Sequence, residues 1–585
     1  MQQKIDPVRL EVIRNSIIRI AEQMGATIQR TAHSPVIYEG LDFVCGILDA
    51  DRNLVGGTSG ITAFLGNLPA ALEDIDNIIG FKNLEEGDIV FCNDPYFGGG
   101  THGNDIASFY PLFEDNKLYG FTAFKGHTLD MGGTYAGGYY NNTTEIFSEL
   151  FRVVPVKLYR RGVLNEDILR LVRANSRTPD YAEGDIRAMV AAVKIGAQRV
   201  KELVRQYGFD QFQLYKNEIL DHSERITREQ IKQIAEGEYS AEYMLDGDGD
   251  DGQPHSTNLK VHLHLTVKNG EIYVDMSDSS PQSTGSLNCT RASSISFIRT
   301  GFKSITTPLI PLNDGCFRPL HIKLKPGTVL DPIPPAAASL WVEVGQSIPD
   351  LFNKALAGTI PNRVRASNFG SDVCDFVYGT DPRTGRFYVN AETAAPGGWG
   401  ATSTRDGVSL FAIIEGDAYY PMCEIFETLY PYLVEKFAFI QNSGGPGKYR
   451  GGLGVERIII PLNHDANLIT AFERQKNTKP WGLFGGKEGH ANFVQIIRKD
   501  GTIEPHEKVT NLPIKAGEKI ILQTGGGGGY GDPKTREPER VHSDVLREYV
   551  SVKAAKEQYG VIVNPTTMTL DQTATATYRK STTKP

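Results

Sequence analysis

Apolar residues near the start of the chain recur at helical spacing. Asp6 and Pro7 form a helix start, because an N-cap acceptor precedes a proline at the first helical position. One helix face beyond them carries a row of apolar residues: Leu10, Ile13, Ile17, Ile20, Met24 and Ile28. Ser34-Pro35 ends the pattern. The chain therefore opens with an amphipathic helix that packs on a larger core.

Strand-like apolar runs and glycine-rich loops follow this helix. The apolar runs that predict strands are 43–48, 88–92, 107–113 and 118–124, and a helical pattern covers 65–79. The loops 93–105 and 125–133 contain several glycines, which allow tight turns and a close approach of the backbone. Because the last two strands fold back on each other, the two loops are expected to meet at one sheet edge.

The rest of the chain divides by its periodicity. Residues 165–235 are rich in helical patterns, and from about residue 237 the period changes to that of strands. Lys268-Asn269-Gly270 predicts a hairpin turn. We therefore expect an α+β, β-rich multidomain fold with mixed sheets. Its predicted parts are an α/β region at 1–164, a helical segment at 165–236, β-rich regions at 237–345 and 346–560, and a flexible tail at 561–585.

Composition narrows the class of protein. The 585 residues are 40% hydrophobic and 22% charged, which is typical of a globular protein with a large core. A net charge of −9 argues against a nucleic-acid partner, and no apolar run is long enough to span a membrane. The six cysteines are dispersed without a CxxC pair, and the N-terminus lacks a signal-peptide pattern. These features predict free buried thiols and a cytoplasmic location.

Glycine is concentrated in clusters later in the chain, mainly at 444–454 and 525–531. Neither cluster has the lysine followed by serine or threonine that a Walker A loop requires. We therefore interpret both clusters as structural turns and expect no nucleotide site in this chain.

A candidate metal site lies in the two early glycine-rich loops. His102, Asp105 and His127 are the proposed ligands, with Asp42 as a fourth candidate. Imidazole and carboxylate groups suit Mn²⁺, Fe²⁺ or Zn²⁺, and so few protein ligands leave coordination positions open. Asp130, three residues after His127, could orient that imidazole. The alternative is that these side chains simply bond to loop amides, and the residues alone leave both interpretations open.

Several motifs resemble the hydantoinase B/oxoprolinase family. They run in the same order along nearly the whole chain: Leu41-Asp42-Phe43, Asn93-Asp94-Pro95-Tyr96, Gly99-Gly100-Thr101-His102-x-x-Asp105, Gly126-His127-x-x-Asp130-x-Gly132-Gly133, the glycine-rich segment 443–454, and Tyr530-Gly531-Asp532-Pro533 after a glycine run. The family includes the B subunit of ATP-hydrolysing N-methylhydantoinase, the caprolactamase β subunit and the C-terminal half of 5-oxoprolinase. It is related to the acetone carboxylase metal subunit.

The resemblance implies a function for the chain and for its candidate site. It implies a hydantoinase A-type partner subunit that binds ATP and Mg²⁺, an (αβ)₂ assembly, and hydrolysis of a lactam, hydantoin or oxoproline-type cyclic amide. The resemblance implies that His102, Asp105 and His127 are metal ligands, and that Asp42 is a ligand or a base. Asp42 and Asp130 are then the catalytic candidates. The alternatives are an ATP-dependent carboxylase of acetone or acetophenone and a non-catalytic scaffold for the ATPase subunit.

Overall fold

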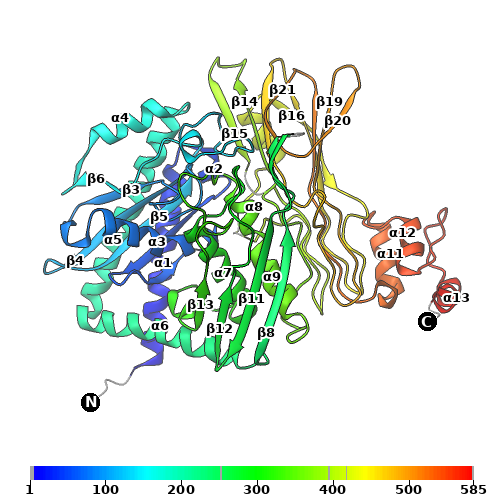
Figure 1. Cartoon of the computed structure of the whole chain (residues 1–585), viewed down its shortest axis with the longest axis horizontal. Helices are drawn as coiled ribbons and strands as arrows, with labels where there is room; N and C mark the ends of the chain where they lie inside the picture. Colours follow the sequence, from blue (N-terminus) through cyan, green and yellow to red (C-terminus); the bar gives the residue numbers. More distant parts are fainter. Residues whose placement is uncertain are drawn as a thin grey trace.

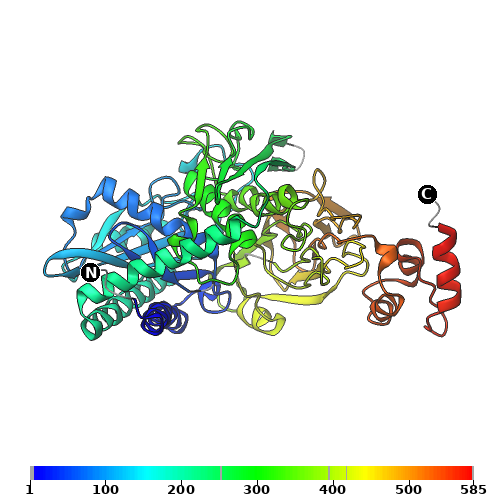
Figure 2. The ribbon, with the colours of Figure 1, turned by 90° about the horizontal axis from the view of Figure 1, so that it is seen from below.

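A computed structural model describes residues 5–58, 60–250, 253–392, 395–414, 416 and 418–582. It confirms the predicted α+β class, with an N-terminal helix and several sheets whose strand pairs are mostly antiparallel. The molecule is elongated, with the N-terminal α/β part at one end and three short C-terminal helices at the other (Figures 1 and 2).

The N-terminal part is built on a seven-stranded antiparallel sheet in the order β2-β1-β5-β4-β3-β6-β7. Its strands are β1 (Phe43–Asp49), β2 (Leu54–Gly57), β3 (Ile89–Cys92), β4 (Asp105–Glu114), β5 (Lys117–His127), β6 (Val156–Arg160) and β7 (Val163–Leu164). β4 and β5 form a long hairpin in which Asp105 lies opposite His127. The expected return of the second strand towards the first is thereby confirmed.

Helices cover both faces of this sheet. On one face lie α1 (Pro7–Thr31) and α5 (Pro179–Tyr207), and the Thr122 hydroxyl of β5 donates to the Val193 carbonyl of α5 at 2.8 Å. On the other face lies α3 (Thr62–Ile78), against which α7 (Arg291–Thr306) packs. Because side chains alternate along a strand, Lys125 and His127 lie on the α3 face. The remaining elements of this part are α2 (Pro35–Tyr38), η1 (Phe81–Asn83), η2 (Ile146–Ser148), α4 (Glu166–Asn175) and α6 (Phe209–Ile231).

The middle of the chain forms a four-stranded sheet in the order β13-β12-β11-β8. Its strands are β8 (Gly237–Met244), β11 (Lys260–Lys268), β12 (Glu271–Asp275) and β13 (Leu320–Lys323), and α9 (Ser347–Leu356) packs against it. Asn269 and Gly270 have φ angles of 54° and 72°, as the predicted hairpin turn requires. Shorter elements nearby are β9 (Asp248–Asp250), β10 (Gln253–Ser256), η3 (Asp314–Phe317) and α8 (Trp341–Gly345).

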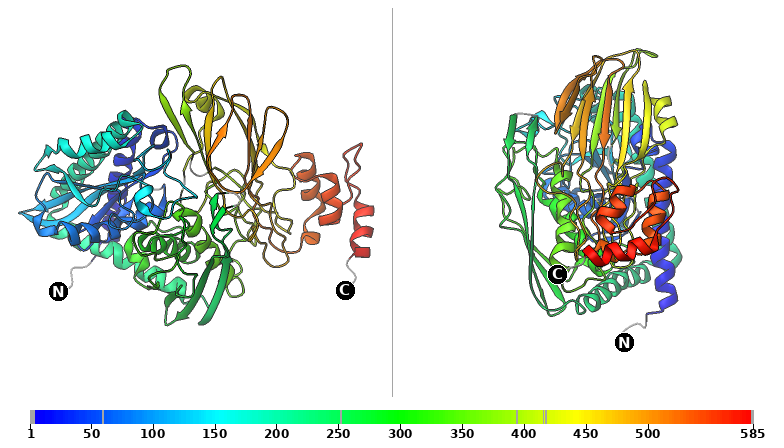
Figure 3. Two further views of the ribbon diagram at one scale, coloured as in Figure 1. Left: turned by 45° about the horizontal axis from the view of Figure 1, so that its top comes forward. Right: turned by 90° about the vertical axis from the view of Figure 1, so that its right-hand side faces the viewer.

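Two further sheets make up most of the C-terminal half (Figure 3). One has the order β15-β14-β18-β21, with strands β14 (Cys374–Thr380), β15 (Phe387–Glu392), β18 (Ala466–Ala471) and β21 (Val509–Ile514). The other has the order β16-β17-β22-β19-β20, with strands β16 (Tyr432–Phe439), β17 (Val455–Pro461), β19 (Phe493–Ile497), β20 (Ile503–His506) and β22 (Lys519–Gln523). The short helix α10 (Cys423–Leu429) packs on β16.

The glycine run 525–529 does not form the structural turn that we expected. Gly525 to Gly529 run without a turn and exchange backbone hydrogen bonds with several neighbouring segments. Gly527 donates to Gly452 at 2.9 Å and accepts from Gly445 at 2.8 Å. A Cβ atom on Gly527 would lie 1.9 Å from the Trp399 carbonyl oxygen. Glycine is therefore needed here because backbones pack directly against one another, a requirement that composition alone does not distinguish from a turn.

The C-terminal segment consists of short helices. The short helices η4 (Pro533–Thr535), α11 (Pro538–Leu546) and α12 (Val552–Tyr559) are followed by α13 (Gln572–Thr582), which lies inside the expected flexible tail. Arg579 of α13 donates to the carbonyl oxygens of Tyr559 at 3.1 Å and Arg536 at 2.7 Å. These bonds tie α13 to the segments before it, and the flexibility expected for 561–585 stays a prediction.

The cysteines are free thiols, as the composition predicted. All six cysteines carry free thiols, and five of them are buried. Among the described residues, no helix combines the length and apolar character that crossing a bilayer demands.

A buried carboxyl group in the C-terminal half gives a pH-dependent prediction. Burial raises the pKa of Asp375 on β14 to about 7, although Arg457 at 3.9 Å opposes this shift. Folding therefore takes up a proton between about pH 4 and pH 7, and stability falls as pH rises through this window. We therefore expect the difference in melting temperature between Asp375→Asn and the wild type to grow by several degrees in favour of the variant as the pH rises from 5 to 8.

Asp381, the residue that follows β14, provides the control. Its hydrogen bonds to Arg383 lower its pKa, so it stays charged across this range. The melting-temperature difference between Asp381→Asn and the wild type should not change between pH 5 and pH 8. An equally constant difference for Asp375→Asn would show that Asp375 does not titrate there.

Candidate metal centre

The hairpin of β4 and β5 brings the candidate ligands together. Asp105 is the first residue of β4 and His127 the last of β5, and the two are paired in register. His102 lies in the loop just before β4, where Thr101 adopts a φ of 72° and donates its N–H to the Ser293 hydroxyl at 2.7 Å. The loop is thus tied to α7, which holds His102 over the end of the hairpin.

Three ligand atoms converge at this point. His102 Nε2 lies 3.0 Å from His127 Nδ1, and Asp105 Oδ1 lies 3.2 Å and 3.1 Å from these two nitrogens. All three side chains are buried, and no other group of three or more histidine, cysteine, aspartate or glutamate residues in the described parts of the chain converges in this way. Ligands at about 2.1 Å from an ion and about 90° apart are themselves separated by about 3.0 Å. The residues present therefore fit a divalent metal ion.

The surroundings of His102 fix the orientation of its ring. Its Nδ1 lies 3.2 Å from the Gly138 carbonyl oxygen, so an N–H at Nδ1 leaves the Nε2 lone pair directed at the triad. Tyr139 packs on the ring at 4.6 Å and Trp341 of α8 at 6.5 Å. Aromatic walls and a fixed tautomer are features of a preformed metal site.

Charges within the triad shift the pKa values of Asp105 and His102. Burial raises the pKa of Asp105, but the charge and hydrogen bonds of His102 and His127 outweigh it and hold that pKa well below its usual range. Burial lowers the pKa of His102, but the nearby Asp105 carboxylate raises it by more, so the pKa of His102 lies above its usual value. Asp105 is thus an anion, which a divalent cation requires of a carboxylate ligand.

Asp42 lies beside the triad. Its carbonyl oxygen accepts a hydrogen bond from the His127 N–H at 3.0 Å, and its charge contributes to raising the pKa of His102. The converging cluster itself consists of His102, Asp105 and His127. The role of Asp42 as ligand or base stays a prediction.

Asp130 does not orient an imidazole in this structure. Its two carboxylate oxygens accept hydrogen bonds from the Arg177 N–H at 2.6 Å and from the Arg177 guanidinium at 2.7 Å. Within the described chain, His127 Nε2 has no hydrogen-bond partner. The expected bond from Asp130 to His127 is therefore absent, because an arginine distant in sequence binds this carboxylate instead.

Lys125 is a charged residue at the site that the sequence analysis did not identify. It lies two residues before His127 on the same face of β5, and its side chain is 1% exposed. Its ammonium group donates to the Gly100 carbonyl oxygen at 3.1 Å, and burial lowers its pKa. The pattern of β5 could have revealed it, since Lys125 directly follows the apolar pair Ala123 and Phe124 inside the strand.

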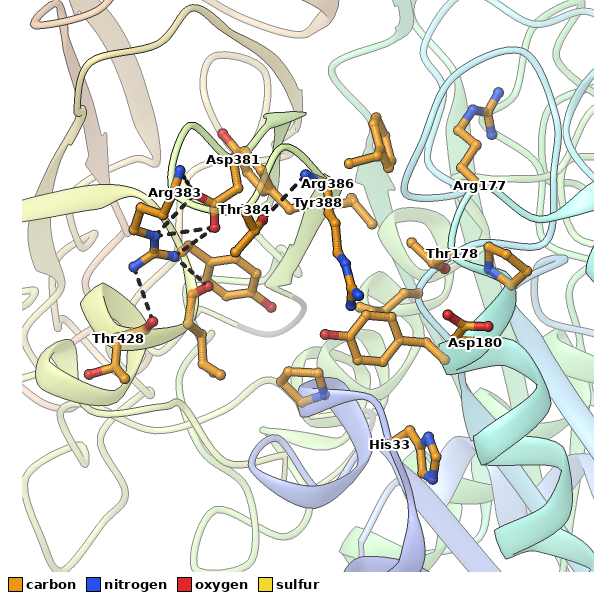
Figure 4. A pocket seen from close by; sticks show the side chains of 18 residues that line it. His33, Arg177, Thr178, Asp180, Asp381, Arg383, Thr384, Arg386, Tyr388 and Thr428 are labelled. Carbon is orange, nitrogen blue, oxygen red and sulfur yellow. Dashed lines mark hydrogen bonds and ion pairs between the residues drawn. The ribbon is translucent and has the colours of Figure 1, made fainter.

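A large cavity adjoins the loop that follows His127. It has a volume of about 920 Å³ and lies between the N-terminal part and the β14–β15 hairpin. Leu129 and Arg177 line one side, and Arg386, Tyr388 and Tyr430 line the other. Figure 4 shows Arg386 extending into the cavity. The cavity is large enough for a small cyclic molecule.

Known proteins resemble the chain over its full length. The putative D-/L-hydantoinase B subunit of Pseudomonas sp. is 30% identical, over 96% of both chains. The caprolactamase beta subunit of Pseudomonas jessenii is 29% identical, over 98% of this chain and 99% of its own. The crystal structure of the ATP-dependent caprolactamase from Pseudomonas jessenii matches with a TM-score of 0.91 and 28% identity, over 99% of this chain and 100% of the matched one.

A second solved structure and a family model extend these matches. The nucleotide-free structure of acetone carboxylase has a TM-score of 0.89 over 98% of this chain and 83% of the matched one. At 20% identity it shows a shared fold only. The family model for hydantoinase B/oxoprolinase matches residues 6–533. The chain belongs to the hydantoinase B/oxoprolinase family, as its motifs had indicated.

Proposed function

We propose that the chain is the metal-binding subunit of an ATP-dependent hydrolase that opens a lactam, hydantoin or oxoproline-type cyclic amide. In this proposal ATP and Mg²⁺ are held by a hydantoinase A-type partner subunit, and the two chains form an (αβ)₂ assembly. The buried triangle of His102, Asp105 and His127 carries the proposal, because it offers a metal site in a chain of this family. The names of the caprolactamase and hydantoinase relatives support the substrate class.

The triad would hold one divalent ion, with zinc, manganese or iron as candidates. His102 contributes Nε2, His127 contributes Nδ1 and Asp105 contributes Oδ1. When bound, such an ion acts as a Lewis acid and can lower the pKa of a bound water to roughly 7. In the proposal Asp42 acts as a further ligand or as a base.

Residues of this chain position the substrate in the proposal. The cavity of Figure 4 admits the ring between Leu129 and the aromatic side chains of Tyr388 and Tyr430. Asp130 holds Arg177 at the wall of this cavity, where its guanidinium can bind a substrate oxygen. Burial of the triad keeps bulk water out and strengthens every charge interaction there.

The amide itself explains the need for ATP. An amide carbonyl is a poor electrophile and its nitrogen a poor leaving group, so attack by water gives an oxyanion that readily collapses back. In the proposal the ATP of the partner subunit phosphorylates this oxyanion and leaves as ADP. The C–N bond then breaks as the hydroxyl proton passes to the ring nitrogen, which gives a ring-opened acyl phosphate. A second water hydrolyses the acyl phosphate to the carboxylate and inorganic phosphate, so ring opening is effectively irreversible. The chain thus supplies the site of attack, and the partner supplies the phosphoryl group.

A substrate panel tests this function. The chain, purified with its hydantoinase A-type partner, is incubated with ATP and with a lactam, a hydantoin or 5-oxoproline. We expect formation of the ring-opened product and of ADP with at least one of them. The competing carboxylase function is tested with labelled bicarbonate and acetone or acetophenone. Labelled product there, with no ring opening in the panel, would contradict the proposal.

A further inference from the structure

A second, smaller cavity lies away from the triad, among α3, α7 and η3. Its volume is about 280 Å³, and none of the three triad residues lines it. Arg365 and Trp399 close it on the side of the C-terminal half. The same two residues also line a neighbouring cavity of about 580 Å³.

Two hydrogen-bond donors of Arg365 lack an acceptor among the described residues. Its Nε and Nη2 are both buried and have no hydrogen-bond partner in the described part of the chain. The guanidinium stacks over the Trp399 ring at 4.3 Å, which holds its plane in place. Nε and Nη2 form one edge of the guanidinium, and their N–H bonds match the two oxygens of a carboxylate. Buried donors without partners are costly, so this edge indicates a missing acceptor.

The other charged side chains of the cavity give it an excess of positive charge. Among the described residues, its lining includes three cations, Arg299, Lys303 and Arg365, but one anion, Asp314. Asp314 pairs with Arg299 at 3.0 Å. The Lys303 ammonium donates to the carbonyl oxygens of Thr307 and Ile310, and the described residues give it no acidic partner. A protein with a net charge of −9 thus keeps a positive cavity here.

Part of the cavity wall is apolar. This part is formed by Leu54, Leu65, Leu312, Phe317, Trp399 and Ile414. An inorganic anion would leave these walls bare, whereas a molecule with a short hydrocarbon body would cover them.

We propose that this cavity binds a small carboxylate whose two oxygens accept from Nε and Nη2 of Arg365 and whose hydrocarbon body packs between Leu65, Phe317 and Trp399. The Lys303 ammonium adds a second positive charge near the carboxylate. This ligand site is separate from the metal centre and does not depend on the proposed hydrolase function.

Calorimetric titration of the purified full-length chain with hexanoate tests the site. Hexanoate should bind, and Arg365→Gln should weaken its binding at least tenfold. Hexanamide, which lacks the charge, and inorganic phosphate, which lacks the hydrocarbon body, should each bind at least tenfold more weakly to the wild type. Equal binding of phosphate and hexanoate would overturn the assignment of a carboxylate with an apolar body.

Two controls separate this site from other effects. Arg318→Gln removes the same charge from a guanidinium that pairs with Asp221 and Glu224 outside the cavity, and hexanoate binding should be unchanged. His102→Ala should also leave hexanoate binding unchanged, because the triad is not involved. Loss of binding in His102→Ala, or equal binding by Arg365→Gln and the wild type, would overturn the proposal.

Crystals soaked with hexanoate give a test that does not require the Arg365 variant to fold. The carboxylate should lie within hydrogen-bonding distance of Arg365 Nε and Nη2. A soaked crystal without hexanoate there, or a complex in which a carboxylate of the partner subunit pairs with Arg365, would contradict the proposed ligand.

Discussion

Replacing His102 with alanine should lower ATP-dependent ring opening by the reconstituted complex about a thousandfold, and His127→Ala should do the same. Each change removes one of three atoms that lie 3.0–3.2 Å apart. An ion left with two protein ligands is bound weakly, and the loss of its several kcal/mol of charge stabilisation corresponds to about this factor in rate. The measurement is turnover on the best substrate of the panel, with metal content determined on the same samples.

A histidine elsewhere in the chain provides the matched control. His264 lies on the half-exposed face of β11, outside the triad. His264→Ala should keep wild-type turnover and metal content. Near-normal turnover in both His102→Ala and His127→Ala would end the hydrolase scheme, and a similar loss in His264→Ala would point to damage of the fold instead.

Gly527→Ala should destabilise the chain by more than about 3 kcal/mol or prevent its folding. The added methyl group would lie 1.9 Å from the Trp399 carbonyl oxygen and 2.6 Å from the Gly400 nitrogen. Both atoms belong to the backbone, so neither can move aside without breaking the hydrogen bonds between neighbouring segments. Thermal unfolding and the yield of folded protein measure the effect.

Gly358 is the matched control for this substitution. A Cβ atom there would meet no heavy atom within 4 Å, and its φ is not positive. Gly358→Ala should therefore leave the melting temperature unchanged or raise it slightly, because alanine restricts the unfolded chain more than glycine does. If Gly527→Ala melted at the same temperature as Gly358→Ala, the glycine clusters would not be packed as described.

The sequence predicted those features that depend on local pattern. Apolar spacing placed α1, and the Asn269-Gly270 turn placed the β11–β12 hairpin. The meeting of His102 and Asp105 with His127 was also predictable. An antiparallel hairpin returns the end of its second strand to the start of its first, whatever lies around it.

Contacts between segments that are far apart in the sequence could not be predicted from local pattern. Asp130 binds Arg177, which belongs to another segment, so its nearness to His127 in sequence was misleading. The packing of Gly527 depends on Trp399 and Gly452, which come from two other segments. The unpartnered edge of Arg365 is visible only once α7 and the C-terminal half are placed together.

The most direct test of metal binding is anomalous diffraction from crystals of the native protein, measured on both sides of the zinc, manganese and iron absorption edges. We predict one strong peak about 2.1 Å from His102 Nε2, His127 Nδ1 and Asp105 Oδ1. The edge at which it appears identifies the ion. Crystals of active protein with no anomalous peak between these three side chains would contradict the assignment.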